Sequence, residues 1–311
     1  MDYLVALQNI RENSPYIIEL IFSIISELTI YVGPVIPVVI YLCIDKKAGV
    51  AIGFTALVGD VVNSLLKITA CVYRPWVRDP RLHIPASMEG TASGYSFPSG
   101  HAAMATTAYG ALALWQKKRK GLVIACISMI LLTAFSRNFL GAHTIEDVLV
   151  AIAEGIILIA LVQIAVNWVS KDEKRDIYVL VIGLVLSIVA LCYTAFKSYP
   201  MDYNELGELL VDPVKMSRDT FSSLGMTIAW LICWFVERRY IKFSIDGTKK
   251  EKIIRAVVAV VLFLLFYMLI FDKLFEPLDP RLEGFLKRFC TIFVVLGIYP
   301  FILKKLQNKK G

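Results

Sequence analysis

The chain of 311 residues is 57% hydrophobic and only 19% charged, whereas soluble domains contain about 45–50% apolar residues. This composition, together with repeated apolar runs long enough to cross a bilayer, excludes an ordinary soluble protein. The net charge of +7 does not indicate nucleic-acid binding, because the basic residues fall in short clusters between apolar runs, as membrane orientation requires.

The N-terminal part of the chain is apolar but interrupted. Residues 16–44 contain two acids, Glu19 and Glu27, and two prolines, Pro34 and Pro37. We therefore expect an interfacial helix over about residues 14–28 and a first spanning helix over about 30–45. The first residues lack a basic region followed by a long apolar core, so we expect no cleavable signal peptide.

The remaining apolar runs predict eight further spanning helices, and a polar loop with several Pro and Gly residues is expected over 74–96. Each run is long enough for a hydrocarbon layer of about 30 Å, the last being the shortest. The predicted fold class is therefore all-α, a polytopic transmembrane bundle of about nine spans. The eight runs lie near 49–73, 98–115, 121–137, 144–169, 177–196, 221–237, 253–271 and 289–303.

The basic residues are unevenly divided between alternate loops. One set of loops contains 20 Lys and Arg residues and the other contains 12. The richer set is expected to be cytoplasmic. The poorer set includes every loop next to the three motifs described below, so these motifs should lie at the outer face, or at the lumenal face of an internal membrane.

The first motif reads K-I-T-A-C-V-Y-R-P over residues 67–75. Arg74 follows Lys67 by seven positions, which is close to two helical turns, so both side chains are expected to point to one spot on a single helix. Pro75 is expected to end that helix. Charged side chains at membrane depth are costly, and their presence indicates a function.

The second motif, P-S-G-H, covers residues 98–101. Ser99 and Gly100 stand where a helix is expected to begin, and the free amides and dipole of a helix N-terminus favour an anion. The absence of a side chain at Gly100 allows a close approach to the backbone. His101 would then lie in the first turn, facing the same pocket.

The third motif, S-R-N-F-L-G-A-H-T-I-E-D, covers residues 136–147. Arg137 offers a planar fork for two phosphate oxygens. His143 and Asp147 are expected to share one face of a helix, where the carboxylate would fix the imidazole tautomer, as in hydrolase triads. Three cations without a carboxylate cluster suit phosphoryl transfer, and we expect no metal and no other cofactor.

Each motif alone has an ordinary structural explanation, such as a helix-end lysine, a common turn or a structural His–Asp pair. Their joint order, spacing and sidedness indicate one site that binds and cleaves a phosphoryl group. The residues by themselves leave open which of His101 and His143 attacks phosphorus.

The three stretches resemble the K-x6-R-P, P-S-G-H and S-R-x5-H-x3-D signature of the type 2 phosphatidic acid phosphatase superfamily. The resemblance implies that His143 forms a phosphohistidine, that Asp147 orients it, and that His101 protonates the leaving oxygen. It also implies that the phosphate is held by Lys67, Arg74, Ser99, Gly100 and Arg137.

The resemblance divides the chain into an N-terminal interfacial helix and first span (1–48), a phosphatase core (49–169) and a four-span extension (170–311). The nine-span layout is similar to the glucose 6-phosphatase and sphingosine phosphate phosphatase branches of the superfamily. The resemblance implies a phosphoric monoester or diphosphate hydrolase embedded in the bilayer. The motif residues predict that it needs no metal, and the clustering of basic residues predicts no nucleic-acid partner.

The preferred substrate is a lipid phosphate or polyprenyl diphosphate. A soluble ester such as a sugar phosphate is the alternative, and a non-catalytic lipid-phosphate binding or transport protein is a third possibility. The sequence does not indicate the oligomeric state.

Overall fold

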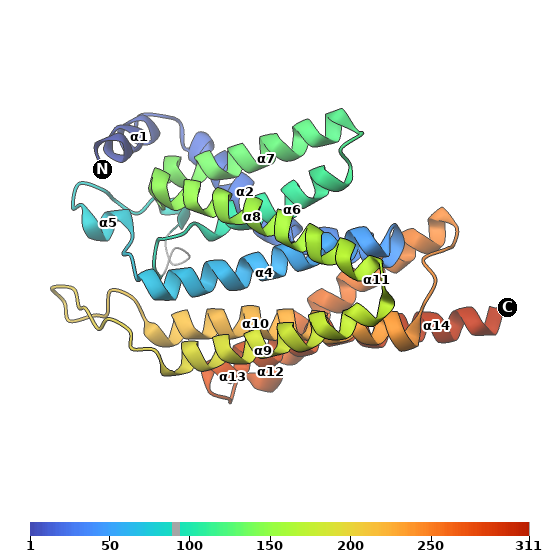
Figure 1. Cartoon of the computed structure of the whole chain (residues 1–311). Coiled ribbons are helices and arrows are strands. Elements are labelled where there is room, and N and C mark those ends of the chain that lie inside the picture. The colour runs from blue at the N-terminus through green and yellow to red at the C-terminus, as the bar shows by residue number, and fades with distance from the viewer. Residues whose placement is uncertain (89–93, 311) are drawn as a thin grey trace. The chain divides into compact units, whose positions relative to one another are not determined.

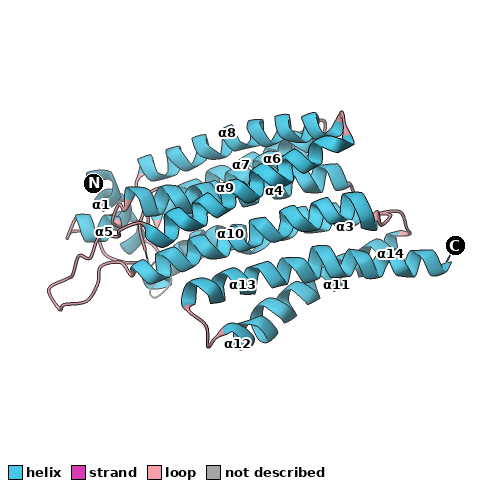
Figure 2. Ribbon diagram, turned by 60° about the horizontal axis from the view of Figure 1, so that its bottom comes forward, coloured by secondary structure: helices cyan, strands magenta, loops and turns pink. Residues whose placement is uncertain are grey.

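The computed structural model describes residues 1–88 and 94–310. Within these ranges the regular elements are all helices, apart from an isolated bridge between Tyr203 and Leu209 (Figure 2). The α-helices are α1 (Asp2–Glu12), α2 (Tyr16–Val32), α3 (Val35–Cys43), α4 (Lys46–Ala70), α5 (Pro75–Arg78), α6 (Gly100–Trp115), α7 (Lys120–Phe139), α8 (Ile145–Ser170), α9 (Asp176–Phe196), α10 (Pro213–Val236), α11 (Lys249–Leu265), α12 (Phe271–Phe275), α13 (Pro280–Phe293) and α14 (Tyr299–Lys310). Short 3₁₀ turns cover Ala86–Met88 and Glu173–Arg175, and π-helical turns follow α10, α11 and α13 at Glu237–Ile241, Phe266–Ile270 and Val294–Ile298.

Several helices begin with the caps that their sequences favour. Ser99 precedes α6, and its hydroxyl accepts a hydrogen bond from the amide of Ala102. Thr248 and Glu251 form a reciprocal capping box at α11, while Asp279 caps α13. Such caps satisfy amides that have no partner inside the helix.

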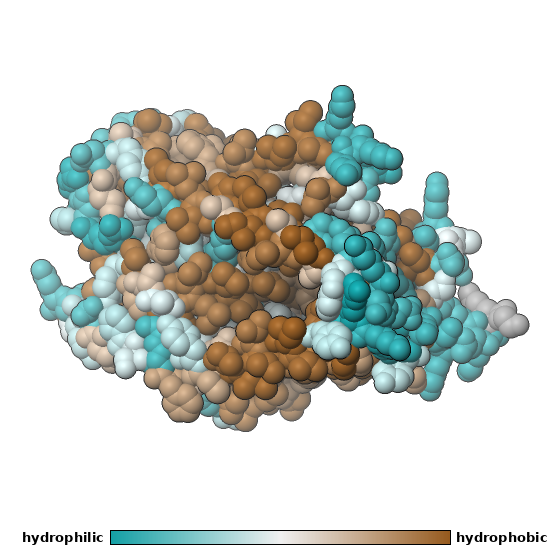
Figure 3. All heavy atoms as spheres, in the orientation of Figure 1, coloured by the Kyte–Doolittle hydropathy of each residue, from teal (hydrophilic) through white to brown (hydrophobic). Residues whose placement is uncertain are grey.

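Among the described residues, seven helical segments are long and apolar enough to cross a membrane, or up to eight if the bent pair α1 and α2 is one span. The all-α, polytopic fold expected from the sequence is confirmed, with fewer such segments than the nine expected. Figure 3 shows apolar side chains along the middle of α7 and α8, with polar side chains gathered toward their ends. The seven segments are Lys46–Arg78, Lys120–Phe139, Ile145–Ser170, Glu173–Phe196, Pro213–Ile241, Lys249–Phe275 and Pro280–Lys309.

The single span expected over residues 30–45 is wrong. Helix α2 ends at Val32 and α3 begins at Val35, so the chain breaks at Gly33 and Pro34. A proline inside a helix cannot donate to the carbonyl four residues earlier and its ring crowds that carbonyl. The span expected near 98–115 is also absent from the seven segments. Helix α6 at this place has 16 residues, whereas a straight crossing needs about 20.

The chain forms two compact units. The first contains residues 1–34, 58–160 and 198–216, and the second contains residues 35–57, 161–197 and 217–311. The second unit has a core of large apolar side chains, including Trp230, Trp234 and Phe243. All the site residues expected from the sequence lie in the first unit, so the site is built within it.

In the first unit, α2 packs along α7 (Figure 1). The ring of Phe22 contacts those of Phe135 and Phe139, with centroids 5.4 and 4.6 Å apart. Farther along, the hydroxyls of Thr29 and Thr133 lie 2.9 Å apart and share a hydrogen bond. Helix α2 is therefore a packed member of the bundle that carries the motifs, and the interfacial position of residues 14–28 stays a prediction.

Candidate active site

The backbone between the first two cations is not the continuous helix expected from their spacing. Helix α4 ends at Ala70, and Cys71 adopts a left-handed conformation with φ of 49°. Arg74 is extended and precedes Pro75, which is the first residue of the one-turn helix α5. Proline is favoured at that position because the missing amide hydrogen would have no partner there. The expectation that Pro75 ends a helix is wrong.

Lys67, in the last turn of α4, contacts the segment that leads into α6. Its ammonium lies 3.1, 3.3 and 2.8 Å from the carbonyl oxygens of Tyr95, Ser96 and Pro98. An ammonium group has three hydrogens to donate, and these carbonyls accept them. In this structure Lys67 therefore fixes the backbone before α6, and direct contact with a phosphate stays a prediction.

The start of α6 lies against the start of α8. The amide of Ser99 donates to the carbonyl of Asp147 over 3.0 Å, and its side chain is fully buried. Gly100 and His101 are the first two residues of α6. A Cβ at Gly100 would meet only the side-chain oxygen of Asn63, at 3.5 Å, so the glycine leaves its helix N-terminus open to an anion.

The turn between α7 and α8 positions His143. Gly141 has φ of 67°, and the amides of Ala142 and His143 both donate to the carbonyl of Arg137. The side chain of Asn138 closes the turn by donating to the carbonyl of His143 over 2.9 Å. His143 thus lies just before α8 rather than on it, although its contact with Asp147 still forms.

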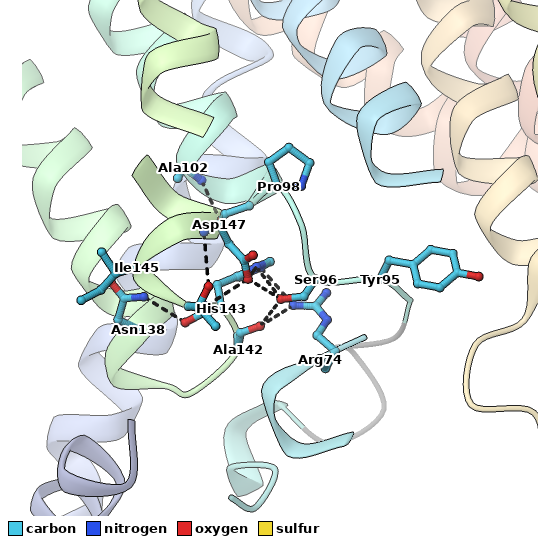
Figure 4. Close-up of polar contacts among 12 residues, drawn as sticks. Arg74, Tyr95, Ser96, Pro98, Ala102, Asn138, Ala142, His143, Ile145 and Asp147 are labelled. Carbon is cyan, nitrogen blue, oxygen red and sulfur yellow. Dashed lines mark hydrogen bonds and ion pairs between the residues drawn. The ribbon is translucent and has the colours of Figure 1, made fainter. Parts of the chain in front are cut away.

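The two nitrogens of His143 face different partners (Figure 4). Nδ1 lies 3.4 Å from a carboxylate oxygen of Asp147, and Nε2 lies 3.0 Å from a guanidinium nitrogen of Arg74. Because a guanidinium only donates and a carboxylate accepts, this arrangement favours the neutral imidazole with its proton on Nδ1. The lone pair of the ring then lies on Nε2.

Asp147 is held by more than the histidine. Its carboxylate accepts hydrogen bonds from the hydroxyl of Ser96 over 2.5 Å and from the amide of Thr144 over 2.9 Å. The hydroxyl of Thr144 lies 3.4 Å from the amide of Asp147 in return, which completes a capping box at α8. Sequence reasoning missed Ser96, and the T-x-x-D spacing was the available signal for the cap.

Arg74 bridges the segment before α6 and the turn before α8. Its guanidinium donates to the carbonyls of Gly94 and Ala142 over 3.2 and 2.9 Å, in addition to its contact with His143. Arg81 is engaged elsewhere, since it pairs with Asp79 and Asp2 over 2.8 and 2.9 Å.

Arg137 and His101 both contact α2. A terminal nitrogen of Arg137 donates to the hydroxyl of Ser26 over 2.7 Å, while the buried Nε has no hydrogen-bond partner among the described residues. His101 Nε2 lies 3.5 Å from a carboxylate oxygen of Glu27. Sequence reasoning missed both α2 residues because their contacts depend on how α2 packs against α7.

The charges around His143 keep its imidazole neutral. Burial and the nearby cations Arg74, Arg137 and Lys67 hold the pKa of His143 well below its ordinary value of 6.5. Burial disfavours the charged form, and each cation disfavours a further positive charge. The charge of a protonated His101 would also lower the pKa of His143, so the two imidazoles influence each other electrostatically. The site is therefore rich in positive charge and contains a neutral imidazole at His143.

No three His, Cys, Asp or Glu side chains come together within residues 1–88 and 94–310 in a way that would hold a metal ion. Metal-independent chemistry stays a prediction.

Comparison with known proteins supports the sequence resemblance. A family model described as PAP2 superfamily matches residues 48–171, and a second, described as PAP2 superfamily phosphatase, transmembrane extension, matches residues 221–310. The chain belongs to the PAP2 superfamily. It is an integral membrane phosphatase of this superfamily with a transmembrane extension. No curated protein and no solved structure matches the chain.

All eight site residues expected from the sequence fall within the segment matched by the PAP2 superfamily model. Ser26 and Glu27 lie outside it, on α2. The site in this PAP2 superfamily member thus combines motif residues with side chains from an N-terminal helix.

Proposed function

We propose that this protein hydrolyses a lipid phosphate or polyprenyl diphosphate through a phosphohistidine intermediate at the outer, or lumenal, membrane face. The observation that carries the proposal is the pair of contacts at His143. One nitrogen faces Asp147, and the other faces the cation Arg74. This is the geometry of a nucleophile oriented by a carboxylate and aimed at an anion site.

The phosphate would be held by groups that surround Nε2 of His143. Arg137 offers its unpaired Nε, and the first amides of α6, at Gly100 and His101, are donors at a helix N-terminus. Arg74 would transfer its hydrogen bond from Nε2 to a phosphate oxygen, which frees the lone pair for attack. Positioning and charge neutralisation of this kind supply most of the catalysis in phosphoryl transfer.

The reaction would then proceed in two displacements. Nε2 of His143 forms a bond to phosphorus while the ester P–O bond breaks, and His101 gives a proton to the leaving oxygen. Next, His101 takes a proton from a water molecule, whose oxygen bonds to phosphorus as the P–N bond breaks. Inorganic phosphate and the dephosphorylated lipid are the products, and both histidines return to their starting state.

The position of the site supports a lipid substrate. It is built at the end of α4 and α7 and at the start of α6 and α8, so a phosphate there would lie at the level of lipid headgroups with its tail in the bilayer. Helix α2, which contacts the site, exposes a stripe of apolar side chains on one face at Ile17, Ile21, Ile24 and Leu28. Such a stripe suits contact with acyl chains and favours a lateral route to the site.

Phosphate release by the purified full-length protein tests the proposal. We expect lipid phosphates or a polyprenyl diphosphate to have a higher kcat/KM than sugar phosphates, in the presence of a chelator and with inhibition by vanadate. A higher kcat/KM for a sugar phosphate would favour the soluble-ester alternative. Loss of activity in the chelator that magnesium restores would contradict the metal-independent mechanism.

A further inference from the structure

A group that protonates the leaving oxygen must itself hold a proton when the substrate is bound. His101 is surrounded by groups that disfavour that proton. Arg137 on α7 and Arg74 before α5 both act on its charge, and His143 lies in the same environment. Burial of the ring is the largest cause and, together with repulsion from each guanidinium, lowers the pKa of His101 from 6.5 to about 4. A bound phosphate would bring negative charge that favours an imidazolium, but the two arginines would neutralise part of that charge.

Glu27 is the acidic side chain that acts on His101 in the part of the chain that the structure describes. One carboxylate oxygen of Glu27 lies 3.5 Å from Nε2 of His101. Apart from this carboxylate, the buried Nε2 has no hydrogen-bond partner among the described residues. The contact comes from α2, which lies outside the segment matched by the family model.

The packing of α2 keeps Glu27 at this place. The neighbouring residue Ser26 is fully buried and accepts a hydrogen bond from Arg137. One turn before, Phe22 packs against two aromatic rings of α7, and just after, the Thr29 hydroxyl shares a hydrogen bond with that of Thr133. Contacts on both sides of Glu27 therefore fix the rotation of α2 about its axis and aim the carboxylate at His101.

We propose that Glu27 is a positioning residue that orients His101 and supports its protonated form, so that Nδ1 faces the leaving oxygen. This inference rests on the proposed function. It gives the site two carboxylate–imidazole pairs, Asp147 with the nucleophile and Glu27 with the acid. In this role Glu27 acts on the reaction through His101 and not through contact with the substrate.

The expected effect is moderate, because the Glu27 side chain is 44% exposed. A fully desolvated opposite charge at this distance shifts a protonation equilibrium by roughly 1–3 pH units, and solvent screening reduces this to about one unit. Removal of the charge should therefore lower the occupancy of the protonated acid by about tenfold near neutral pH.

The test compares Glu27→Gln with the wild-type full-length protein on an alkyl phosphate and an aryl phosphate. The alkyl leaving group needs the acid more, so kcat should fall by about tenfold for the alkyl substrate and much less for the aryl one. The pH above which kcat falls should move down by about one unit. Glu27→Asp should give an intermediate profile, because it keeps the charge at a greater distance.

Glu19→Gln is the matched control. It makes the same substitution on the same helix, but Glu19 pairs with Arg11 and accepts a hydrogen bond from the amide of Ser87. Its pH profile and leaving-group dependence should match the wild type. Equal losses on both substrates in Glu27→Gln, with an unchanged pH profile, would overturn the proposal and leave Glu27 with a packing role only.

A second measurement separates this inference from the proposed function. The chain has three histidines, so NMR of protein labelled at histidine gives three imidazole titrations, which variants at His83 and His101 assign. The midpoint of His101 should be lower in Glu27→Gln than in wild type, with and without inorganic phosphate. An identical midpoint overturns the inference even if turnover is normal. A shifted midpoint in a protein that hydrolyses no phosphate ester would confirm that Glu27 supports the protonated form of His101 and would reject the proposed function.

Discussion

At the scale of residues, the two imidazoles differ in their partners. His143 contacts Asp147 and Arg74, whereas His101 contacts Glu27. His143→Ala should lose essentially all turnover but still bind vanadate, because the cations remain. His101→Ala should lose about 10²- to 10⁴-fold on an alkyl phosphate and less on an aryl phosphate or a diphosphate. Steady-state kinetics with both leaving groups, together with vanadate binding, checks this division of roles.

The same set includes Asp147→Asn, which should fold but turn over slowly, because the negative charge that orients His143 is gone. If the two histidine variants lose the same factor on aryl and alkyl substrates, the assignment of acid and nucleophile is wrong. A phosphoenzyme trapped on His101 would reverse the roles.

The charge state of His143 gives a second prediction at this scale. Its pKa lies well below 6.5 because of burial and nearby cations, so the free enzyme should keep this imidazole neutral at pH 6.5. The unfolded chain takes up the proton first as the pH falls, so this group lowers stability below about pH 6.5. NMR titration of labelled histidine measures the midpoint of His143. A His143 midpoint at or above 6.5 would contradict the prediction.

At the scale of elements, motif spacing predicted which side chains meet but not the backbone that brings them together. An offset of seven positions from Lys67 to Arg74 fits two helical turns, yet α4 ends at Ala70 and the chain turns at Cys71 before Pro75 starts α5. A local spacing rule cannot distinguish a helix from a helix followed by a turn when both satisfy the same contacts.

The contribution of α2 could not be predicted for a different reason. The apolar pattern of residues 16–32 indicates a helix, but Ser26 and Glu27 reach Arg137 and His101 only through the packing of α2 on α7. A single amino-acid sequence does not indicate which residues of two distant helices will contact each other. The membrane class and the motif residues, by contrast, follow from local composition and order.

The turn before α8 offers an element-scale prediction with a built-in control. Gly141 and Gly207 both have positive φ, of 67° and 77°, so an alanine at either should cost about 1 kcal/mol of stability. Neither Cβ would meet a close atom, since the nearest atom at Gly141 is a guanidinium nitrogen of Arg11 at 3.6 Å and none lies within 4 Å at Gly207. Only Gly141→Ala should also reduce kcat, because its turn positions His143. Thermal unfolding and steady-state kinetics of both variants check this. If both variants lower the melting temperature equally and both lose activity, the turn at Gly141 has no special role in positioning His143.

At the scale of the whole molecule, the distribution of charge predicts the orientation in the membrane. The loops next to the motifs belong to the set with 12 basic residues, and the opposite set has 20. Basic residues near spans remain on the cytoplasmic side. The site would then act on phosphate groups at the outer leaflet, or at the lumenal leaflet of an internal membrane.

Two exposed positions on either side of one membrane segment test this orientation. Leu206 is 83% exposed in the loop between α9 and α10, and Lys250 is exposed in the first turn of α11. The segment Pro213–Ile241 lies between them and is long and apolar enough for one crossing, so the two positions should lie on opposite sides. In a background with the six native cysteines replaced, an impermeant maleimide should label Leu206→Cys in intact cells. It should label Lys250→Cys only after permeabilisation. The reverse pattern would mean that the site faces the cytoplasm, and labelling of both in intact cells would mean that Pro213–Ile241 does not cross the membrane.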